Sequence, residues 1–194
     1  MLLLVIGHSY VRDLASLGEF SFNNGSIPIN IRYSSIPGAS YDHFLKNRSI
    51  LSEKLACRPD IVVVILGGNS ILRDLTKQEL FNQCREFYSI LRDELPSATI
   101  ISAQIENRFY KPGNRYGALF GEEYRRRRND LNKYLNKLKS KDTVIDNRLN
   151  VCGPGRLDNE IYYRDEVHLN YNGLKKYMSM LKCTVLYALN NKRY

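Results

Sequence analysis

The chain has 194 residues, of which 43% are hydrophobic and 25% are charged, and its formal net charge at pH 7 is +9. These values are typical of a soluble globular protein with a sizeable core, and they exclude disorder, collagen and coiled coil as descriptions of the whole chain. We expect one domain that spans residues 1–194, because no repeat or linker divides the sequence.

The apolar run at the start of the chain, residues 1–6, is too short to cross a bilayer, which takes about 20 residues. No basic residue precedes this run and no small-residue cleavage site follows it, so we predict neither a signal peptide nor stable membrane insertion. The four cysteines are far apart in the sequence, and their spacing indicates no metal site. We therefore expect reduced thiols, an intracellular and cytoplasmic location, and no metal or other cofactor.

Short runs of branched apolar residues alternate along the chain with segments of helical periodicity. The predicted strands are Leu2–Ile6, Ile27–Tyr33, Ile61–Leu66, Ala98–Ala103 and Thr143–Ile145. The predicted helices are Tyr10–Leu17, Tyr41–Ala56, Thr76–Leu95, Leu119–Lys139 and Asn170–Leu189. This alternation predicts an α/β fold, a three-layer α/β/α sandwich in which right-handed crossovers join the strands of an open parallel sheet.

Open parallel sheets bind their ligands beyond the carboxyl ends of the strands, so the residues that follow each strand are candidates for function. Ser9 follows the first predicted strand, Gly38 the second and Asn69 the third. Asp165 and His168 precede the last predicted helix. A serine, a histidine, an aspartate and several N–H donors are the groups that acyl transfer through a serine nucleophile requires.

Each of these residues has a distinct predicted role. The Ser9 hydroxyl is a weak nucleophile that needs a base, and His168 carries an imidazole, the side chain that takes up protons near neutral pH. Asp165, three residues earlier, would orient this ring and stabilise its charged form. The oxyanion of the tetrahedral intermediate would be bound by the backbone N–H groups of Gly38 and Ser9 and by the side-chain amide of Asn69.

Taken singly, each feature also has an ordinary structural explanation. Ser9 after a strand can simply cap a helix, Gly67-Gly68 can form a turn, and Asp165 can cap the last helix. The catalytic interpretation depends on the ordered set of four segments, each of them at a predicted strand end or just before the last helix.

This ordered set resembles the SGNH (GDSL-type) hydrolase superfamily over essentially the whole chain. The family blocks read Gly-Asp-Ser-hydrophobic, then a glycine, then Gly-x-Asn-Asp, then Asp-x-x-His. The corresponding segments here are Gly7-His8-Ser9-Tyr10, Gly38, Gly67-Gly68-Asn69-Ser70 and Asp165-Glu166-Val167-His168. The resemblance implies a flavodoxin-like five-stranded parallel sheet in the order 2-1-3-4-5, and hydrolysis of esters without a metal.

Two residues depart from the family pattern. His8 replaces the aspartate beside the nucleophile, and Ser70 replaces the aspartate after the oxyanion asparagine. We expect the residues at these two positions to support the shape of the site and its hydrogen bonds, so the replacement of the family aspartates can reduce activity. The Gly-His-Ser opening also resembles esterase domains encoded by animal retrotransposons.

We therefore predict a serine esterase that acts on short, acetyl-type esters, because the chain has little length beyond the core fold for a large lid. The alternative prediction is a catalytically weak or silent protein of the same fold that binds RNA or single-stranded DNA. Its basis is charge: residues 104–141 hold eleven basic and four acidic side chains, and residues 174–194 hold five basic and no acidic ones. A protein-interaction module is a third interpretation, which no sequence feature favours.

The predicted nucleic-acid surface combines basic side chains with neighbouring aromatic ones. Its candidate residues are Arg108, Lys111, Arg125, Arg126 and Arg128. We expect the two basic helices to pack on opposite faces of the sheet beside its last strand, so that they flank one groove. The arginines of residues 125–128 can equally form a solvated helix face that binds nothing.

Overall fold

The computed structural model describes residues 1–18, 22–25, 27–108, 117–138, 143–146, 161–163 and 167–191, with the backbone alone for residues 117–120 and 143–146. The strands in these ranges are β1 (Leu2–Gly7), β2 (Phe22–Asn24), β3 (Ile27–Ser35), β4 (Ile61–Ile65), β5 (Thr99–Ala103) and β6 (Thr143–Asp146). The helices are α1 (Ser9–Ala15), α2 (Tyr41–Lys46), α3 (Arg48–Leu55), α4 (Gly68–Ile71), α5 (Lys77–Glu94), α6 (Gly117–Lys137) and α7 (Tyr171–Asn191). None of these described helices is both long enough and apolar enough to span a membrane.

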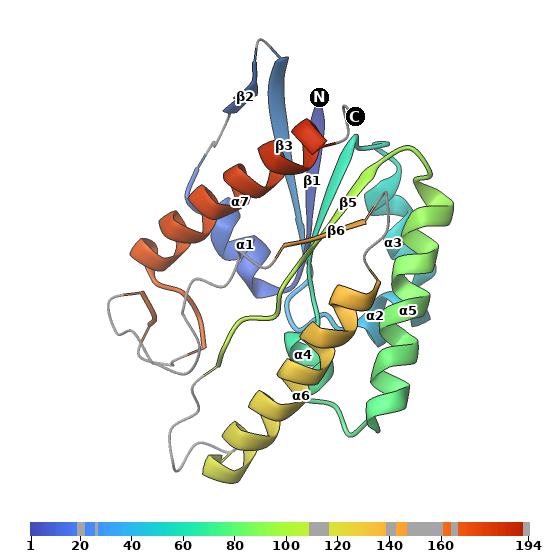
Figure 1. Ribbon diagram of the computed structural model, residues 1–194, viewed down its shortest axis with the longest axis vertical. Helices are drawn as coiled ribbons and strands as arrows, with labels where there is room; N and C mark the ends of the chain where they lie inside the picture. Colours follow the sequence, from blue (N-terminus) through green and yellow to red (C-terminus); the bar gives the residue numbers. More distant parts are fainter. Residues whose placement is uncertain are drawn as a thin grey trace.

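The strands form one sheet in the order β2-β3-β1-β4-β5-β6 (Figure 1). β1 pairs in parallel with β3 and β4, β4 pairs in parallel with β5, and β5 with β6. The predicted order of five parallel strands is therefore confirmed. The sequence does not predict β2, an edge strand antiparallel to β3, because its three residues are too few to show a period of two.

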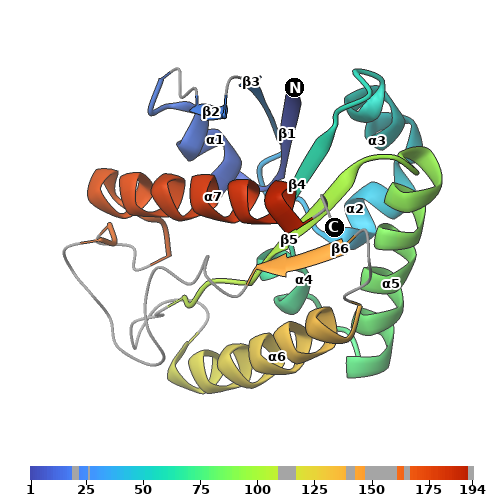
Figure 2. The same ribbon diagram turned by 45° about the horizontal axis from the view of Figure 1, so that its top comes forward.

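Helices cover both faces of the sheet (Figures 1 and 2). On one face, Leu3 and Val5 of β1 share a buried cluster with residues of α1 and α7, including Leu181. On the other face, Leu4 and Ile6 of β1 share a second buried cluster with residues of α2, α3, α5 and α6. Successive strand side chains point to opposite faces, so a strand buried on both sides needs an unbroken apolar run, as β1 and β4 have. The expected placement of the two basic helices, α6 and α7, on opposite faces is confirmed.

Two helical details differ from the prediction. The predicted helix over residues 41–56 is two helices, because the backbone at Asn47 has a non-helical ψ of 59°. The Asn47 side chain donates a hydrogen bond to the carbonyl of His43, a local bond of the kind that ends helices. The sequence also does not predict α4, because its four residues begin at a pair of glycines that is typical of a turn.

The register of the central strands brings three strand ends to the same edge of the sheet. Gly7, at the end of β1, is paired with Ser35 at the end of β3 and with Ile65 at the end of β4. These three strands lead into the segments that carry the predicted nucleophile and the predicted oxyanion-binding residues. The fold therefore gathers those segments at one place, as the strand-end argument requires.

Candidate active site

Ser9 is the first residue of α1 and lies directly beyond the end of β1. Its Oγ is hydrogen bonded to Nε2 of His168 at 3.0 Å. The two residues are 159 positions apart in the sequence, so it is the fold that brings them together. When the ring proton is on Nδ1, the serine hydroxyl donates to Nε2, which is the arrangement in which an imidazole can take the serine proton.

His168 lies in the segment just before α7, and backbone bonds hold that segment in place. Tyr162 and Leu169 form an antiparallel bridge. The N–H of Tyr163 donates to the carbonyl of His168 at 2.9 Å. The histidine is therefore fixed by its own backbone as well as by its contact with the serine.

Tyr10 of α1 also contacts this segment. Its hydroxyl donates a hydrogen bond to the carbonyl of Val167, and its ring centre lies 6.0 Å from that of His168. Asp165, the third member of the predicted triad, lies outside the described residues. Its contact with His168 therefore stays a prediction.

His8, which stands where the family has an aspartate, is buried beside the nucleophile. Its Nδ1 accepts a hydrogen bond from the N–H of Tyr10 at 3.4 Å, so the ring caps the start of α1 as an aspartate would. Burial, together with the nearby charges of Arg108 and His168, lowers the pKa of His8 from 6.5 to about 3. The ring is therefore neutral near pH 7, and Nδ1 remains an acceptor.

Ser70, the second departure from the family pattern, is fully buried. Its Oγ accepts a hydrogen bond from the N–H of Tyr41 at 3.0 Å, which ties α4 to the start of α2. His8 and Ser70 thus each keep a hydrogen-bond acceptor at a position where the family has a carboxylate. Both support the hydrogen bonds of the site, as we expected, but neither brings a negative charge.

Gly38 and Asn69 lie in neighbouring segments at the strand ends. Gly38 has a φ of +74°, a conformation that favours glycine. A Cβ at this position would meet no atom of the described residues within 4 Å, so the backbone of Gly38 borders open space. The Asn69 Nδ2 donates to the carbonyl of Ala39 at 3.0 Å. This bond places the Asn69 amide beside the Gly38 turn, as a shared oxyanion site would need.

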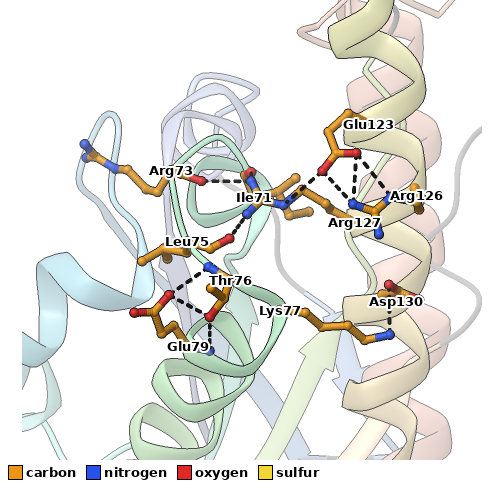
Figure 3. A network of polar contacts seen from close by, with 10 residues as sticks. All are labelled: Ile71, Arg73, Leu75, Thr76, Lys77, Glu79, Glu123, Arg126, Arg127 and Asp130. Atoms are coloured by element: carbon orange, nitrogen blue, oxygen red, sulfur yellow. Dashed lines mark hydrogen bonds and ion pairs between the residues drawn. The ribbon is translucent and has the colours of Figure 1, made fainter.

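The short helix that carries Asn69 is held by Arg127 of α6 (Figure 3). The Arg127 guanidinium donates to the carbonyls of Ile71 at 2.6 Å and Arg73 at 2.8 Å, and also to that of Leu75. These carbonyls lie at the end of α4 and in the loop after it, where the helix supplies no partners for them. Arg127 therefore clamps this loop, and nothing in its run of four arginines indicates that role from the sequence.

Arg108, a candidate residue of the predicted nucleic-acid surface, is only partly exposed and contacts Asn69; its role in nucleic-acid binding stays a prediction. Its Nη2 donates to Oδ1 of Asn69 at 3.2 Å, and its guanidinium carbon lies 5.8 Å from the centre of the Tyr124 ring. With His8 and Gly68 it lines a hollow of about 10 Å³, roughly the space of one water molecule. Arg108 follows β5, and residues that follow the strands of a parallel sheet are candidates for the site. Because Arg108 also lies in a basic segment, the sequence favours a role in nucleic-acid binding.

The other residues of the predicted nucleic-acid surface are dispersed. We expected Arg128 on an exposed basic face, but it is buried, and its guanidinium donates to the side chains of two asparagines. Arg126 is exposed and paired with a glutamate of the same helix, and Arg125 is exposed. Lys111 lies outside the described residues. Nucleic-acid binding thus stays a prediction, and Arg125 and Arg126 are the candidates that are exposed in the described residues.

Ser9 and His168 supply a nucleophile and a base within hydrogen-bond distance of it. Within the described ranges, no group of three or more His, Cys, Asp and Glu side chains could hold a metal ion. The 3.0 Å contact between Ser9 Oγ and His168 Nε2 is the geometry that nucleophilic attack with proton transfer to the ring requires.

The sequence matches the model of the GDSL-like Lipase/Acylhydrolase family over residues 8–176. No curated protein matches the sequence significantly. Among solved structures, a GDSL-like lipase from Bacteroides thetaiotaomicron is similar with a TM-score of 0.67 and 15% identity, covering 96% of this chain and 88% of that chain. A serine-to-alanine mutant of an acetyl esterase with an acetate ion has a TM-score of 0.68 and 12% identity, covering 98% and 99% of the two chains. A carbohydrate esterase of family 3 from Talaromyces cellulolyticus has a TM-score of 0.69 and 12% identity, covering 98% and 99%. At such identities these structures show the shared fold alone.

Proposed function

The chain belongs to the GDSL-like lipase/acylhydrolase family, and from this membership we propose that it is a serine esterase that hydrolyses short, acetyl-type esters. The observation that carries the proposal is the 3.0 Å hydrogen bond between Ser9 Oγ and His168 Nε2. A serine hydroxyl needs a neighbouring base to act as a nucleophile, and this bond supplies one.

In the first half of the reaction, Ser9 Oγ attacks the carbonyl carbon of the ester while His168 Nε2 takes the hydroxyl proton. The protonated ring then gives this proton to the leaving alcohol as the C–O bond breaks, and the acyl group stays on Ser9. In the second half, water attacks the acyl carbon and gives a proton to His168; the acid leaves and Ser9 regains its proton. We assign to Asp165 the orientation of the His168 ring.

For the oxyanion formed in both halves, we assign the backbone N–H groups of Gly38 and Ser9 and the side-chain N–H of Asn69. The open space beside Gly38 supports this assignment. So does the bond from Asn69 Nδ2 to Ala39, because an amide nitrogen carries two hydrogens and this bond uses one of them. Donors fixed before the reaction stabilise the developing charge without having to reorganise.

The proposed preference for short acyl groups is supported by the similar structures, which include an acetyl esterase and a carbohydrate esterase of family 3. Each of these two likenesses covers 98% of this chain. A small acyl group is therefore the substrate class that we propose for this site.

The single-domain organisation over residues 1–194, the cytoplasmic location and the resemblance of the Gly-His-Ser opening to retrotransposon-encoded esterase domains stay predictions. The proposed reaction needs none of them, because it depends on the residues around Ser9.

The proposal is tested with 4-nitrophenyl acetate and a fluorophosphonate probe. The wild type should hydrolyse the ester without added metal, and the probe should label Ser9. Ser9→Ala and His168→Ala should each remove most of the rate, and the double variant should lose little more, because the two residues act as a unit. Ser16→Ala, an exposed serine at the end of α1, is the matched control and should behave as wild type. An undiminished rate in Ser9→Ala would contradict the proposal.

A further inference from the structure

We propose that Arg108 is a positioning residue for the oxyanion hole: its guanidinium fixes the Asn69 side-chain amide in the orientation that turns an N–H toward the substrate. This inference rests on the proposed esterase function and assigns to it a residue that the family motifs do not contain. The observation behind it is the hydrogen bond from Arg108 Nη2 to Asn69 Oδ1 at 3.2 Å.

The Asn69 amide has two fixed ends. Its nitrogen donates to the carbonyl of Ala39, and its oxygen accepts from Arg108. A carbonyl only accepts and a guanidinium only donates, so a flipped amide would face an acceptor with an acceptor and a donor with a donor. The two contacts together therefore permit one orientation, in which the second N–H of Asn69 is left for the oxyanion. Without Arg108, the Ala39 carbonyl would be the one remaining hydrogen-bond partner of the amide among the residues that the structure describes.

The surroundings of Arg108 hold its guanidinium at this position. The ring of Tyr124 on α6 lies 5.8 Å from the guanidinium carbon, at a distance where a cation and an aromatic face attract each other. Tyr124 is itself buried, and its hydroxyl donates to the carbonyl of Glu106 in the same loop as Arg108. The guanidinium is therefore supported by a ring that is itself held in place.

Gly68 gives the guanidinium room to reach the amide. A Cβ at position 68 would lie 2.8 Å from Arg108 Nη2, closer than a real Cβ contact allows. The backbone of Gly68 has no positive φ, so alanine fits the helix there and the arginine must move instead. The second glycine of the Gly67-Gly68 pair thus has a role beyond forming a turn. Its replacement displaces Arg108 without removing it.

The charge of Arg108 also acts on the same amide. A charged donor polarises the bond system that it joins, so an N–H on the far side of the Asn69 amide becomes a better donor to an oxyanion. His8, which lines the same hollow together with Glu106, is neutral and adds no second positive charge there. Both effects act on the transition state more than on the bound ester, because the oxyanion forms only there.

The test compares the steady-state hydrolysis of 4-nitrophenyl acetate by Arg108→Met, Arg108→Lys and Gly68→Ala, each checked for folding by circular dichroism. Arg108→Met should lower kcat by roughly 10-fold or more and leave KM within about 2-fold, because a partly lost oxyanion donor costs less than the roughly 100-fold of a full loss. Arg108→Lys keeps a charged donor and should recover part of kcat. Gly68→Ala should reproduce the kcat loss of Arg108→Met while the arginine is still present.

The deciding measurement repeats Arg108→Met in an Asn69→Ala background. If Arg108 acts through Asn69, the second substitution should change kcat by less than about 2-fold there. An equal loss in both backgrounds, or a wild-type kcat in Arg108→Met, would overturn the inference. These results differ from a failure of the proposed function, in which the wild type itself would show no hydrolysis that depends on Ser9; that outcome would overturn both.

Discussion

The hydroxyl of Tyr10 donates a hydrogen bond to the backbone carbonyl of Val167. Tyr10 follows the proposed nucleophile in the chain, and Val167 precedes the proposed base. The bond therefore joins the buried side chain of the residue after Ser9 to the backbone of the residue before His168. It fixes the separation of the reacting side chains independently of their own hydrogen bond.

Tyr10→Phe removes this bond and keeps the ring. We expect the free energy of unfolding to fall by about 1 kcal/mol, the usual contribution of one hydrogen bond. We also expect kcat for 4-nitrophenyl acetate to fall roughly 10-fold, because a small displacement of a catalytic group is costly. Tyr171→Phe, an exposed tyrosine at the start of α7, is the control. If both variants keep the wild-type kcat, the bond does not position the histidine.

Asn69→Ala removes one proposed oxyanion donor. We expect kcat to fall by roughly 100-fold or more, as for other single oxyanion-hole donors. The fold should remain, because the Asn69 side chain is only partly buried and lies outside the two apolar clusters. Asn82→Ala on the exposed face of α5 is the matched control. The assignment fails if kcat is unchanged, or if the rate is lost only together with the circular dichroism signal of the folded protein.

Much of the fold could be predicted because it depends on local patterns. β1 and β4 are unbroken apolar runs, and such runs alternating with helical segments are found in parallel sheets. The location of the site could be predicted from the same strands, because parallel strands in register end at one edge of the sheet. The sequence therefore predicts that Ser9 and Asn69 lie at the same edge of the sheet.

The remaining features depend on single side chains that reach distant backbone. Arg127 binds carbonyls more than 50 positions earlier in the chain, and Arg108 binds an amide 39 positions earlier. Neither contact produces a recognisable sequence pattern, because an arginine that binds a carbonyl and one that faces solvent look alike in sequence. The break at Asn47 is also invisible to apolar spacing, which continues from α2 into α3.

His8→Asn should change how stability depends on pH. The pKa of buried His8 is about 3 in the folded protein against 6.5 for an exposed ring, so folding favours the neutral form. The resulting stabilisation is fully present above pH 6.5 and is lost progressively as the pH falls toward 3, because the unfolded chain takes up a proton that the folded protein does not. From pH 7 to pH 5 this residue should lower the free energy of unfolding by about 2 kcal/mol.

Asparagine does not titrate and can still cap α1. Urea unfolding at pH 7 and pH 5 measures the difference: the wild type should lose about 2 kcal/mol more than His8→Asn between the two values. Equal losses in the two proteins would show that His8 takes no part in the pH dependence.

Arg127→Met tests whether Arg127 holds the end of α4 and the loop after it. The control is Arg126→Met, which changes the exposed arginine next to it in the chain. Arg127 donates to three carbonyls at the end of α4 and in the loop after it (Figure 3), and its side chain is only 17% exposed. Arg126 contacts Glu123 and is 64% exposed. Loss of the clamp leaves partly buried carbonyls without their donor, so the free energy of unfolding should fall by about 1–3 kcal/mol in Arg127→Met. In Arg126→Met it should change by less than about 0.5 kcal/mol, because exposed ion pairs contribute little.

Because α4 carries Asn69, kcat should fall as well in Arg127→Met and stay at the wild-type value in Arg126→Met. Equal effects of the two substitutions on stability and kcat would mean that the clamp does not hold the oxyanion loop.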